Sequence, residues 1–276
     1  MSTKAAEKAY LTHSQSHAWE IAKPFSPPGQ EMFAQGAELL HDFAAAMLVL
    51  QPAPDDLILD LGAGAGWCSD LLSRLNRRSV AVDIAFDMLR VGRERPGFSL
   101  RAVTGDMEAL PFASRSFSKA ICLSALHHVP DIPAATREIA RVLSDDGVVL
   151  FSEPGQGHAD AEVSTTATRH YGVLEQEVLA GRFMQTCRDA GFRDVRLQPL
   201  AYAIPGYSLA AEDWAAWSRL ASSSRPRRAV RKIALGVAEL FGFGKRGALF
   251  EDTFAMTLVR TLRPVIERHP IVVARK

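Results

Sequence analysis

The residues best suited to chemistry lie in the run LILDLGAGAGW, residues 57–67. Its apolar first half is typical of a buried strand, and Gly62, Gly64 and Gly66 separate that strand from a predicted helix over residues 67–75. Glycines in such a turn let a ligand approach the bare backbone, because no Cβ stands in the way. The unpaired amides at the start of the helix then point toward that ligand.

Two carboxylates narrow the choice of ligand. Asp83 ends the next apolar strand, SVAVD, where an acidic side chain can accept hydrogen bonds from both hydroxyls of a ribose. Asp60 precedes the first glycine and would repel a pyrophosphate, so it suits a cofactor with an ammonium or sulfonium group. A dinucleotide fingerprint needs a small residue where this chain has Trp67, which counts against a nicotinamide or flavin.

The pattern D-x-G-x-G-x-G resembles motif I of the class I S-adenosylmethionine-dependent methyltransferases. Further segments follow in that family's order, and the resemblance covers most of residues 50–200 and the C-terminus. It implies an α/β, Rossmann-like class I methyltransferase fold: a mostly parallel seven-stranded sheet with helices on both faces. The segments are VAVDIAFDML, TGDMEALPF, KAICLSALHHV, REIARVLSDDGVVLFSEP, MQTCRDAGFRDVRL and, as the seventh strand, IVVARK.

The same resemblance implies S-adenosylmethionine as the cofactor and assigns the residues that hold it. Asp83 would bind the ribose, and Asp106 with its neighbour Met107 would hold the adenine. The full predicted set is Asp60, Gly62, Ala63, Gly64, Gly66, Asp83, Ile84, Asp106, Met107 and Ser124.

Methyl transfer mainly requires alignment of the acceptor with the methyl group, and a base is needed only if the acceptor loses a proton. His127 follows Leu126 after the fourth strand, where a histidine acts as base in related small-molecule methyltransferases. The resemblance therefore implies His127 as the base. Tyr10 is a candidate partner of this base, and His128 is a second candidate histidine. Glu153 ends the fifth strand and is expected to face the same crevice, as base or acceptor ligand. The alternative that these side chains only pack and cap the loop stays open.

The chain divides into four predicted parts. Residues 1–50 form an N-terminal cap segment and helix, and residues 51–202 form the S-adenosylmethionine-binding core. Residues 203–268 have helical spacing and read as an insertion between strands six and seven, which serves as a lid or an oligomer contact. Residues 269–276 return as the final strand. Within the core, the small and polar residues 155–171 are expected to form a loop.

Composition limits the partners and the compartment. A net charge of +1 provides no overall field for nucleic acid or a membrane surface. Residues 31–50 have the spacing of a helix that covers the cofactor side of the sheet, but no apolar run approaches the ~18 residues of a spanning helix. Three scattered cysteines suit a reducing cytoplasm, and the eight histidines show no metal-ligand spacing, so no metal is expected.

The sequence therefore predicts a cytoplasmic enzyme that moves a methyl group from S-adenosylmethionine to a small-molecule or carrier-bound acceptor, with sugar- or lipid-linked acceptors as candidates. We expect no nucleic acid, no stable membrane insertion and a candidate homodimer. Two alternatives come from other classes: a nicotinamide-dependent oxidoreductase on a Rossmann domain, and a non-catalytic S-adenosylmethionine-binding partner protein. The basic stretch 225–232 could recognise a phosphate or be a solvated helix face.

Overall fold

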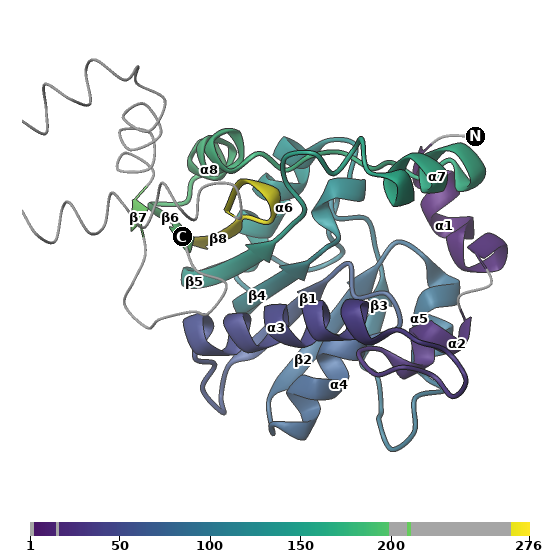
Figure 1. Cartoon of the computed structure of the whole chain (residues 1–276). Helices are drawn as coiled ribbons and strands as arrows, with labels where there is room; N and C mark the ends of the chain where they lie inside the picture. The colour runs from purple at the N-terminus through teal and green to yellow at the C-terminus, as the bar shows by residue number, and fades with distance from the viewer. Residues whose placement is uncertain (1–2, 15–16, 199–208, 211–265) are drawn as a thin grey trace, which may run out of the picture.

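A computed structural model describes residues 3–14, 17–198, 209–210 and 266–276 (Figure 1). These residues form one sheet with helices on both faces. The strands are β1 (Leu57–Leu61), β2 (Arg78–Asp83), β3 (Ala102–Thr104), β4 (Phe117–Leu123), β5 (Leu143–Ser152), β6 (Asp194–Gln198), β7 (Leu209–Ala210) and β8 (Ile271–Arg275). The helices are α1 (Thr3–Ser14), α2 (His17–Ala22), α3 (Phe33–Leu50), α4 (Trp67–Arg74), α5 (Phe86–Gly92), the short 3-10 helix η1 (Leu126–His128), α6 (Ile132–Val142), α7 (Glu162–Tyr171) and α8 (Ala180–Asp189).

The strand order is β3-β2-β1-β4-β5-β8-β6-β7. The first five strands of the chain pair in parallel, whereas β8 runs antiparallel between β5 and β6. This confirms the predicted mostly parallel α/β sheet, and residues 271–275 of the predicted last strand pair with the sixth strand, β6. A two-residue strand, β7, extends the edge beyond the seven strands expected. The predicted helical insertion, apart from that strand and residues 266–268, lies outside the described residues, as does the basic stretch 225–232.

Apolar residues on both faces of the central strands explain why the sheet is buried. Ile58 and Ile121 lie in a cluster with side chains of α3 and α4, while their neighbours Leu59 and Cys122 lie in a second cluster with α6 and α8. Successive strand residues point to opposite faces, so a continuous apolar run serves two helix layers at once. The carboxyl ends of β1, β2 and β4 are thereby held side by side.

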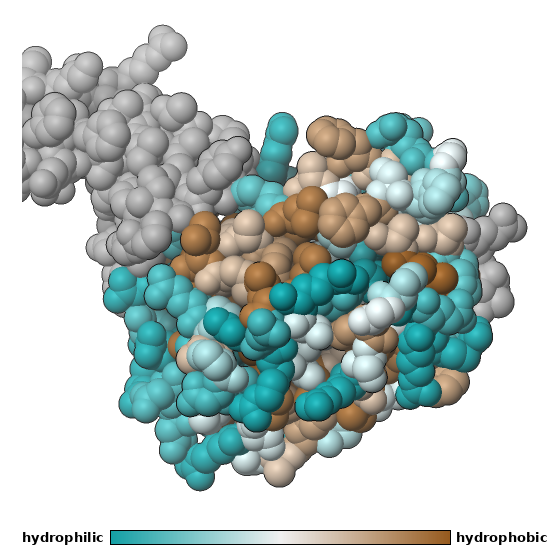
Figure 2. Space-filling view, turned by 90° about the horizontal axis from the view of Figure 1, so that it is seen from below, coloured by the Kyte–Doolittle hydropathy of each residue, from teal (hydrophilic) through white to brown (hydrophobic). Residues whose placement is uncertain are grey.

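Helix α3 covers one face of the sheet, where Phe43 packs against Trp67 with ring centroids 6.4 Å apart. Among the described residues, α3 is one helix that is long and apolar enough to cross a membrane by length and composition, although polar residues interrupt it and 33% of its residues are buried. Figure 2 shows hydrophobic residues exposed between hydrophilic ones on the face seen from below. The exposed large apolar side chains of α3 are Phe33, Leu40 and Leu48.

The prediction of a loop over residues 155–171 is wrong for the second half of this segment, which forms α7. Small and polar residues suggested a loop, but the helix packs against α1, where Tyr171 meets Tyr10 with ring centroids 5.4 Å apart. Gly172 ends α7 in the left-handed conformation, at φ 73°. Tertiary packing outweighs the local composition here.

A buried arginine anchors the N-terminal segment to the core. The guanidinium of Arg95 is 4% exposed and pairs with Asp70 of α4 at 3.0 Å. Its remaining N–H groups donate to the carbonyl oxygens of Glu20, Ile21 and Lys23 at 3.2, 2.8 and 2.6 Å. Five donors in a rigid fork suit such a convergence of acceptors. Helix α2 and the turn after it are thus fixed to α4 and to the segment that follows α5.

We predict that Arg95→Ala lowers the free energy of unfolding by about 3–5 kcal/mol, because three carbonyls lose their donor and buried Asp70 keeps only Arg74 as a charged partner. Hydrogen exchange should also show α2 less protected relative to β1. Arg90→Ala is the matched control, since Arg90 is 55% exposed in its pair with Asp87. The control should change stability by less than about 1 kcal/mol; equal effects of the two variants would refute the anchoring role.

Candidate functional site

A cavity of about 330 Å³ lies at the carboxyl ends of β1, β2 and β4. The glycine turn after β1 forms part of its wall. Gly62 has φ +62°, and an added Cβ would lie 2.3 Å from the Cβ of Ala125, so the close approach of these two loops requires glycine. Eight of the predicted cofactor residues lie along this cavity: Gly62, Ala63, Gly64, Asp83, Ile84, Asp106, Met107 and Ser124.

Asp83 connects the glycine turn to the end of β2. Its two carboxylate oxygens accept the N–H of Gly64 at 2.7 Å and the N–H of Ala85 at 2.8 Å. Burial raises the pKa of Asp83, although these two hydrogen bonds act in the opposite direction. Each oxygen keeps a lone pair for a further donor, so the carboxylate can receive hydroxyl groups from a ligand in the cavity.

Asp60 and Gly66 shape the turn and are not among the residues that line the cavity. Asp60 is 4% exposed and accepts hydrogen bonds from the N–H and the hydroxyl of Ser69, at 3.0 and 2.7 Å. Burial raises its pKa to about 6, with the Ser69 hydrogen bonds acting in the opposite direction. Gly66 caps α4 at φ +71°, where an added Cβ would lie 2.6 Å from the side chain of Leu100.

The N-terminal helices supply a wall that motif analysis did not assign. Glu7 and Tyr10 of α1, Trp19 and Glu20 of α2, and Lys23 after them all line the cavity. Of these five residues, only Tyr10 is expected at the site from the sequence. No spacing rule connects these residues to the core motifs, and the packing of α1 and α2 on α5 brings them there.

Glu153 lies behind the cavity wall and holds the loop after β4. It is 1% exposed, and its oxygens accept the backbone N–H groups of Ala125, Leu126 and His127 at 3.1, 3.0 and 3.3 Å. The Nδ1 of His127 and the thiol of Cys122 complete the set, at 2.9 and 3.3 Å. Burial opposes ionisation, but these donors hold the pKa of Glu153 below its usual value. The geometry is that of a loop cap, the alternative left open for this residue.

The two neighbouring histidines occupy different positions. His127 is 4% exposed and does not line the cavity; its ring lies between Glu153 and Glu175. His128 does line the cavity, and its Nδ1 is 2.6 Å from the carbonyl oxygen of Leu174. A carbonyl only accepts, so Nδ1 carries the proton and Nε2 is left with a lone pair. Burial, together with the neighbouring His127, lowers the pKa of His128.

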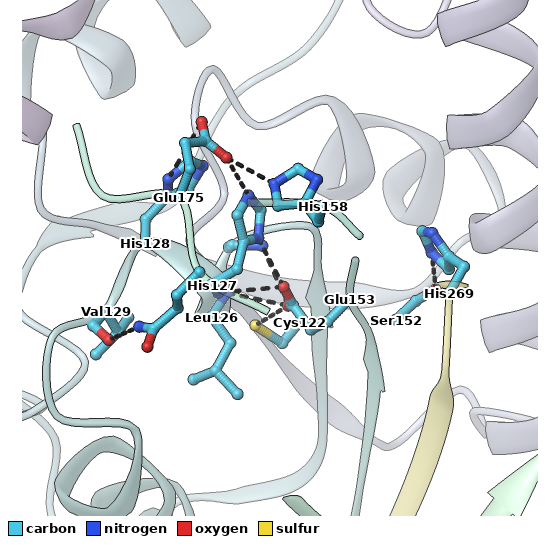
Figure 3. Close-up of polar contacts among 12 residues, drawn as sticks. Cys122, Leu126, His127, His128, Val129, Ser152, Glu153, His158, Glu175 and His269 are labelled. Carbon is cyan, nitrogen blue, oxygen red and sulfur yellow. Dashed lines mark hydrogen bonds and ion pairs between the residues drawn. The ribbon is translucent and has the colours of Figure 1, made fainter. Parts of the chain in front are cut away.

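Glu175 completes this part of the site, and sequence analysis missed it. It lines the cavity and accepts a hydrogen bond from His158 at 2.7 Å (Figure 3). Burial opposes ionisation of Glu175, whereas the hydrogen bond from His158 and the nearby His128 lower its pKa. No motif marks residue 175, which lies in the irregular segment between α7 and α8.

Part of the chain is similar in sequence to known methyltransferases. Residues 59–151 match the family described as "Methyltransferase domain". The chain is 38% identical over 102 residues to a demethylmenaquinone methyltransferase of Thermobifida fusca, covering 36% of this chain and 43% of that protein. It is 41% identical over 102 residues to a malonyl-acyl-carrier-protein O-methyltransferase of Halorhodospira halophila, covering 36% of this chain and 35% of that protein.

A solved structure of a methyltransferase has a similar fold. The phosphoethanolamine N-methyltransferase 2 of Haemonchus contortus, in complex with S-adenosyl-L-methionine, has a TM-score of 0.57 and 17% sequence identity. The match covers 98% of this chain and 59% of that one. The chain spans less than half the length of the curated relatives it matches.

The raised pKa of Asp60 predicts a pH-dependent gain in stability for Asp60→Asn. Folding favours the protonated carboxyl, so its contribution to stability is fully present below the ordinary pKa of 3.8 and is lost as pH rises through about 6. The neutral amide still offers Ser69 an acceptor. Above pH 6 the variant should therefore be more stable than the wild type, by up to about 3 kcal/mol, since one pKa unit equals about 1.4 kcal/mol.

Chemical denaturation at pH 8 and pH 5 measures this difference, which should shrink at the lower pH. Asp87→Asn is the control, because Asp87 is 43% exposed on α5. A stability difference for Asp60→Asn that is the same at both pH values would show that the ionised carboxylate carries no burial cost.

Proposed function

Because this chain carries a methyltransferase domain of the class I S-adenosylmethionine-dependent family, we propose that it transfers a methyl group from S-adenosylmethionine to a small-molecule or carrier-bound acceptor. The observation that carries the proposal is the Asp83 carboxylate beside a glycine turn at the cavity wall. The cavity volume of about 330 Å³ falls within the range usual for small-molecule sites, roughly 300–1,000 Å³.

The residues present fit the proposed cofactor. Asp83 would hold the ribose hydroxyls, and Asp106 with Met107 lies farther along the same wall, where the adenine would be held. The glycine turn leaves the backbone open to a ligand at Gly64, which lines the cavity and where an added Cβ would meet only Glu20 Oε2, at 3.8 Å. When bound, S-adenosylmethionine supplies an activated methyl group on a sulfonium.

His128 is the residue we propose as proton acceptor. Its Nδ1–H donates to the carbonyl of Leu174, which fixes the tautomer and leaves the Nε2 lone pair free to take a proton. Its lowered pKa keeps the ring neutral at pH 7, as a base must be. His127, the base expected from the sequence, has both ring nitrogens directed at carboxylates and lies behind the wall.

The charge of the cavity favours a neutral or cationic acceptor. Five carboxylates line it: Glu7, Glu20, Asp83, Asp106 and Glu175. Its two lysines already pair with acidic residues, Lys4 with Asp106 and Glu108, and Lys23 with Glu20. An anionic acceptor would meet repulsion here. We therefore place a hydroxyl or amine acceptor, sugar- and lipid-linked ones included, ahead of a free carboxylate such as that of malonyl-acyl-carrier protein.

We predict that S-adenosylhomocysteine binds and that Asp83→Asn weakens this binding roughly 10- to 150-fold, the equivalent of about 1.5–3 kcal/mol for a hydrogen bond to a charged group. Asn still accepts the N–H of Gly64 or Ala85, so the fold is retained. Calorimetry with Asp83→Asn and the exposed control Asp87→Asn measures the difference. Wild-type protein that shows no heat of binding and no rise in melting temperature at saturating ligand would refute the cofactor assignment.

His128→Asn should lower kcat by about 10²–10⁴ for an acceptor that loses a proton. S-adenosylhomocysteine affinity should stay nearly unchanged. The wild-type rate should rise as pH increases through a midpoint below the ordinary histidine pKa of 6.5, because the pKa of His128 is lowered. Labelled S-adenosylmethionine and a metabolite extract identify the acceptor, and kinetics of His128→Asn against His170→Asn then follow. Wild-type kcat in His128→Asn would contradict its role as base.

A further inference from the structure

A cluster of two histidines and a glutamate lies beside the cavity. His127, His158 and Glu175 each offer one donor atom, and these atoms all lie within 4.8 Å of one another. Figure 3 shows the rings of His127 and His158 converging on the Glu175 carboxylate from different segments. The residues come from η1, the stretch after β5 and the stretch before α8, so they are distant in sequence.

The donor geometry is that of a site for a divalent transition-metal ion. Glu175 Oε2 lies 2.7 Å from His158 Nε2 and 3.6 Å from His127 Nε2. Donors bound tetrahedrally at about 2.1 Å from Zn²⁺ are about 3.4 Å apart, so small movements would bring all three donors to one ion. Two imidazoles and one carboxylate match the ligand preference of Zn²⁺ and its first-row neighbours, whereas Mg²⁺ and Ca²⁺ prefer oxygen ligands.

The surroundings of His127 orient it as a ligand. The Glu153 carboxylate, which accepts three backbone N–H groups, lies 2.9 Å from Nδ1 of His127, so the proton is on Nδ1 and the Nε2 lone pair faces Glu175. A carboxylate on the far nitrogen is the usual support of a metal-bound histidine, since it fixes the tautomer and raises the basicity of the other nitrogen. His127 is also held on its flank by His128, with ring centroids 3.9 Å apart.

Charge balance is a second, independent observation. Among the described residues, the ion-pair partners of Glu153 and Glu175 are all histidines, and no lysine or arginine neutralises either carboxylate. Their side chains are only 1% and 11% exposed. Backbone N–H groups already offset the desolvation of Glu153, whereas Glu175 has only histidines as ion-pair partners, so a cation beside Glu175 would offset the desolvation of that carboxylate. A divalent cation between the three donors would supply this positive charge.

We propose that His127, His158 and Glu175 bind one divalent transition-metal ion, with Zn²⁺ as the type case. Three protein ligands leave a fourth position for water or for an oxygen of another molecule. Glu175 also lines the cavity, so the ion lies at its wall. The role of the ion rests on the proposed methyl transfer: the ion would bind an oxygen of the methyl acceptor at the fourth position. Metal binding lowers the pKa of a bound hydroxyl, so the ion would help that acceptor to lose its proton.

Titration of the 276-residue chain without a tag with Co²⁺ tests the site, because the visible absorption of Co²⁺ reports its coordination. We expect one equivalent to bind and Zn²⁺ to displace it. Glu175→Gln and His158→Ala should each weaken binding by about 100-fold or more, the upper end of what loss of even a supporting residue costs. His170→Ala, a histidine of α7 outside the cluster, should bind as the wild type does.

Two results would overturn the proposal: no saturable binding of Co²⁺ or Zn²⁺ by the wild type, or unchanged affinity in both Glu175→Gln and His158→Ala. Circular dichroism melting shows that each variant is folded. The readout does not depend on S-adenosylhomocysteine, whose binding is measured separately on the same samples. Binding of the ion without binding of S-adenosylhomocysteine would refute the proposed function and support the metal site. Binding of S-adenosylhomocysteine without binding of the ion would refute the metal site and support the proposed function.

Discussion

Glu153 places a carboxylate with almost no solvent access at the point where β4 and β5 end, and the candidate site is arranged around it. Its oxygens accept three consecutive backbone N–H groups of the loop after β4, together with the ring of His127. Without this acceptor the three N–H groups would be buried without partners, at a cost of about 1–3 kcal/mol each. One side chain thus fixes the loop that carries both histidines. In this loop His128 lies on the cavity wall and His127 lies behind it.

The parts of the fold that could be predicted are those in which local sequence is sufficient. The strand, the glycine turn and the start of α4 follow from one short run, because Gly62 and Gly66 need positive φ and the strand needs apolar residues on both faces. The order of later strands came from segments that match a family in series. The helix α7 was missed, because its stability comes from packing on α1 and not from its small polar residues.

The residues of the site likewise fall into those that the sequence predicts and those that only the tertiary structure brings together. Residues on the turns that follow β1 and β2 were predicted, since strand ends in a parallel sheet meet at one edge. Glu175 was not, nor was the meeting of His127 with His158, because these residues share no spacing and converge only through tertiary structure. The expectation that no metal binds rests on spacing along the sequence and stays a prediction; the proposed site is an alternative to it, because its donors come from three separate segments and spacing does not report their convergence. Likewise, Arg95 sets the position of α2 through contacts with carbonyl groups, which leave no mark on the sequence.

The carboxylates of the cavity connect the cofactor, the proton chemistry and the proposed ion. Burial raises the pKa values of Glu7 and Asp83, and the proximity of Glu175 raises that of Glu7 further. A cation entering the cavity, whether a sulfonium, an ammonium or a metal ion, favours the ionised carboxylates and lowers those pKa values. In the pH range where Glu7 and Asp83 titrate, binding of such a cation is therefore coupled to release of protons, and its affinity increases with pH there. A cavity wall of this kind selects its ligands by charge before any individual hydrogen bond is made.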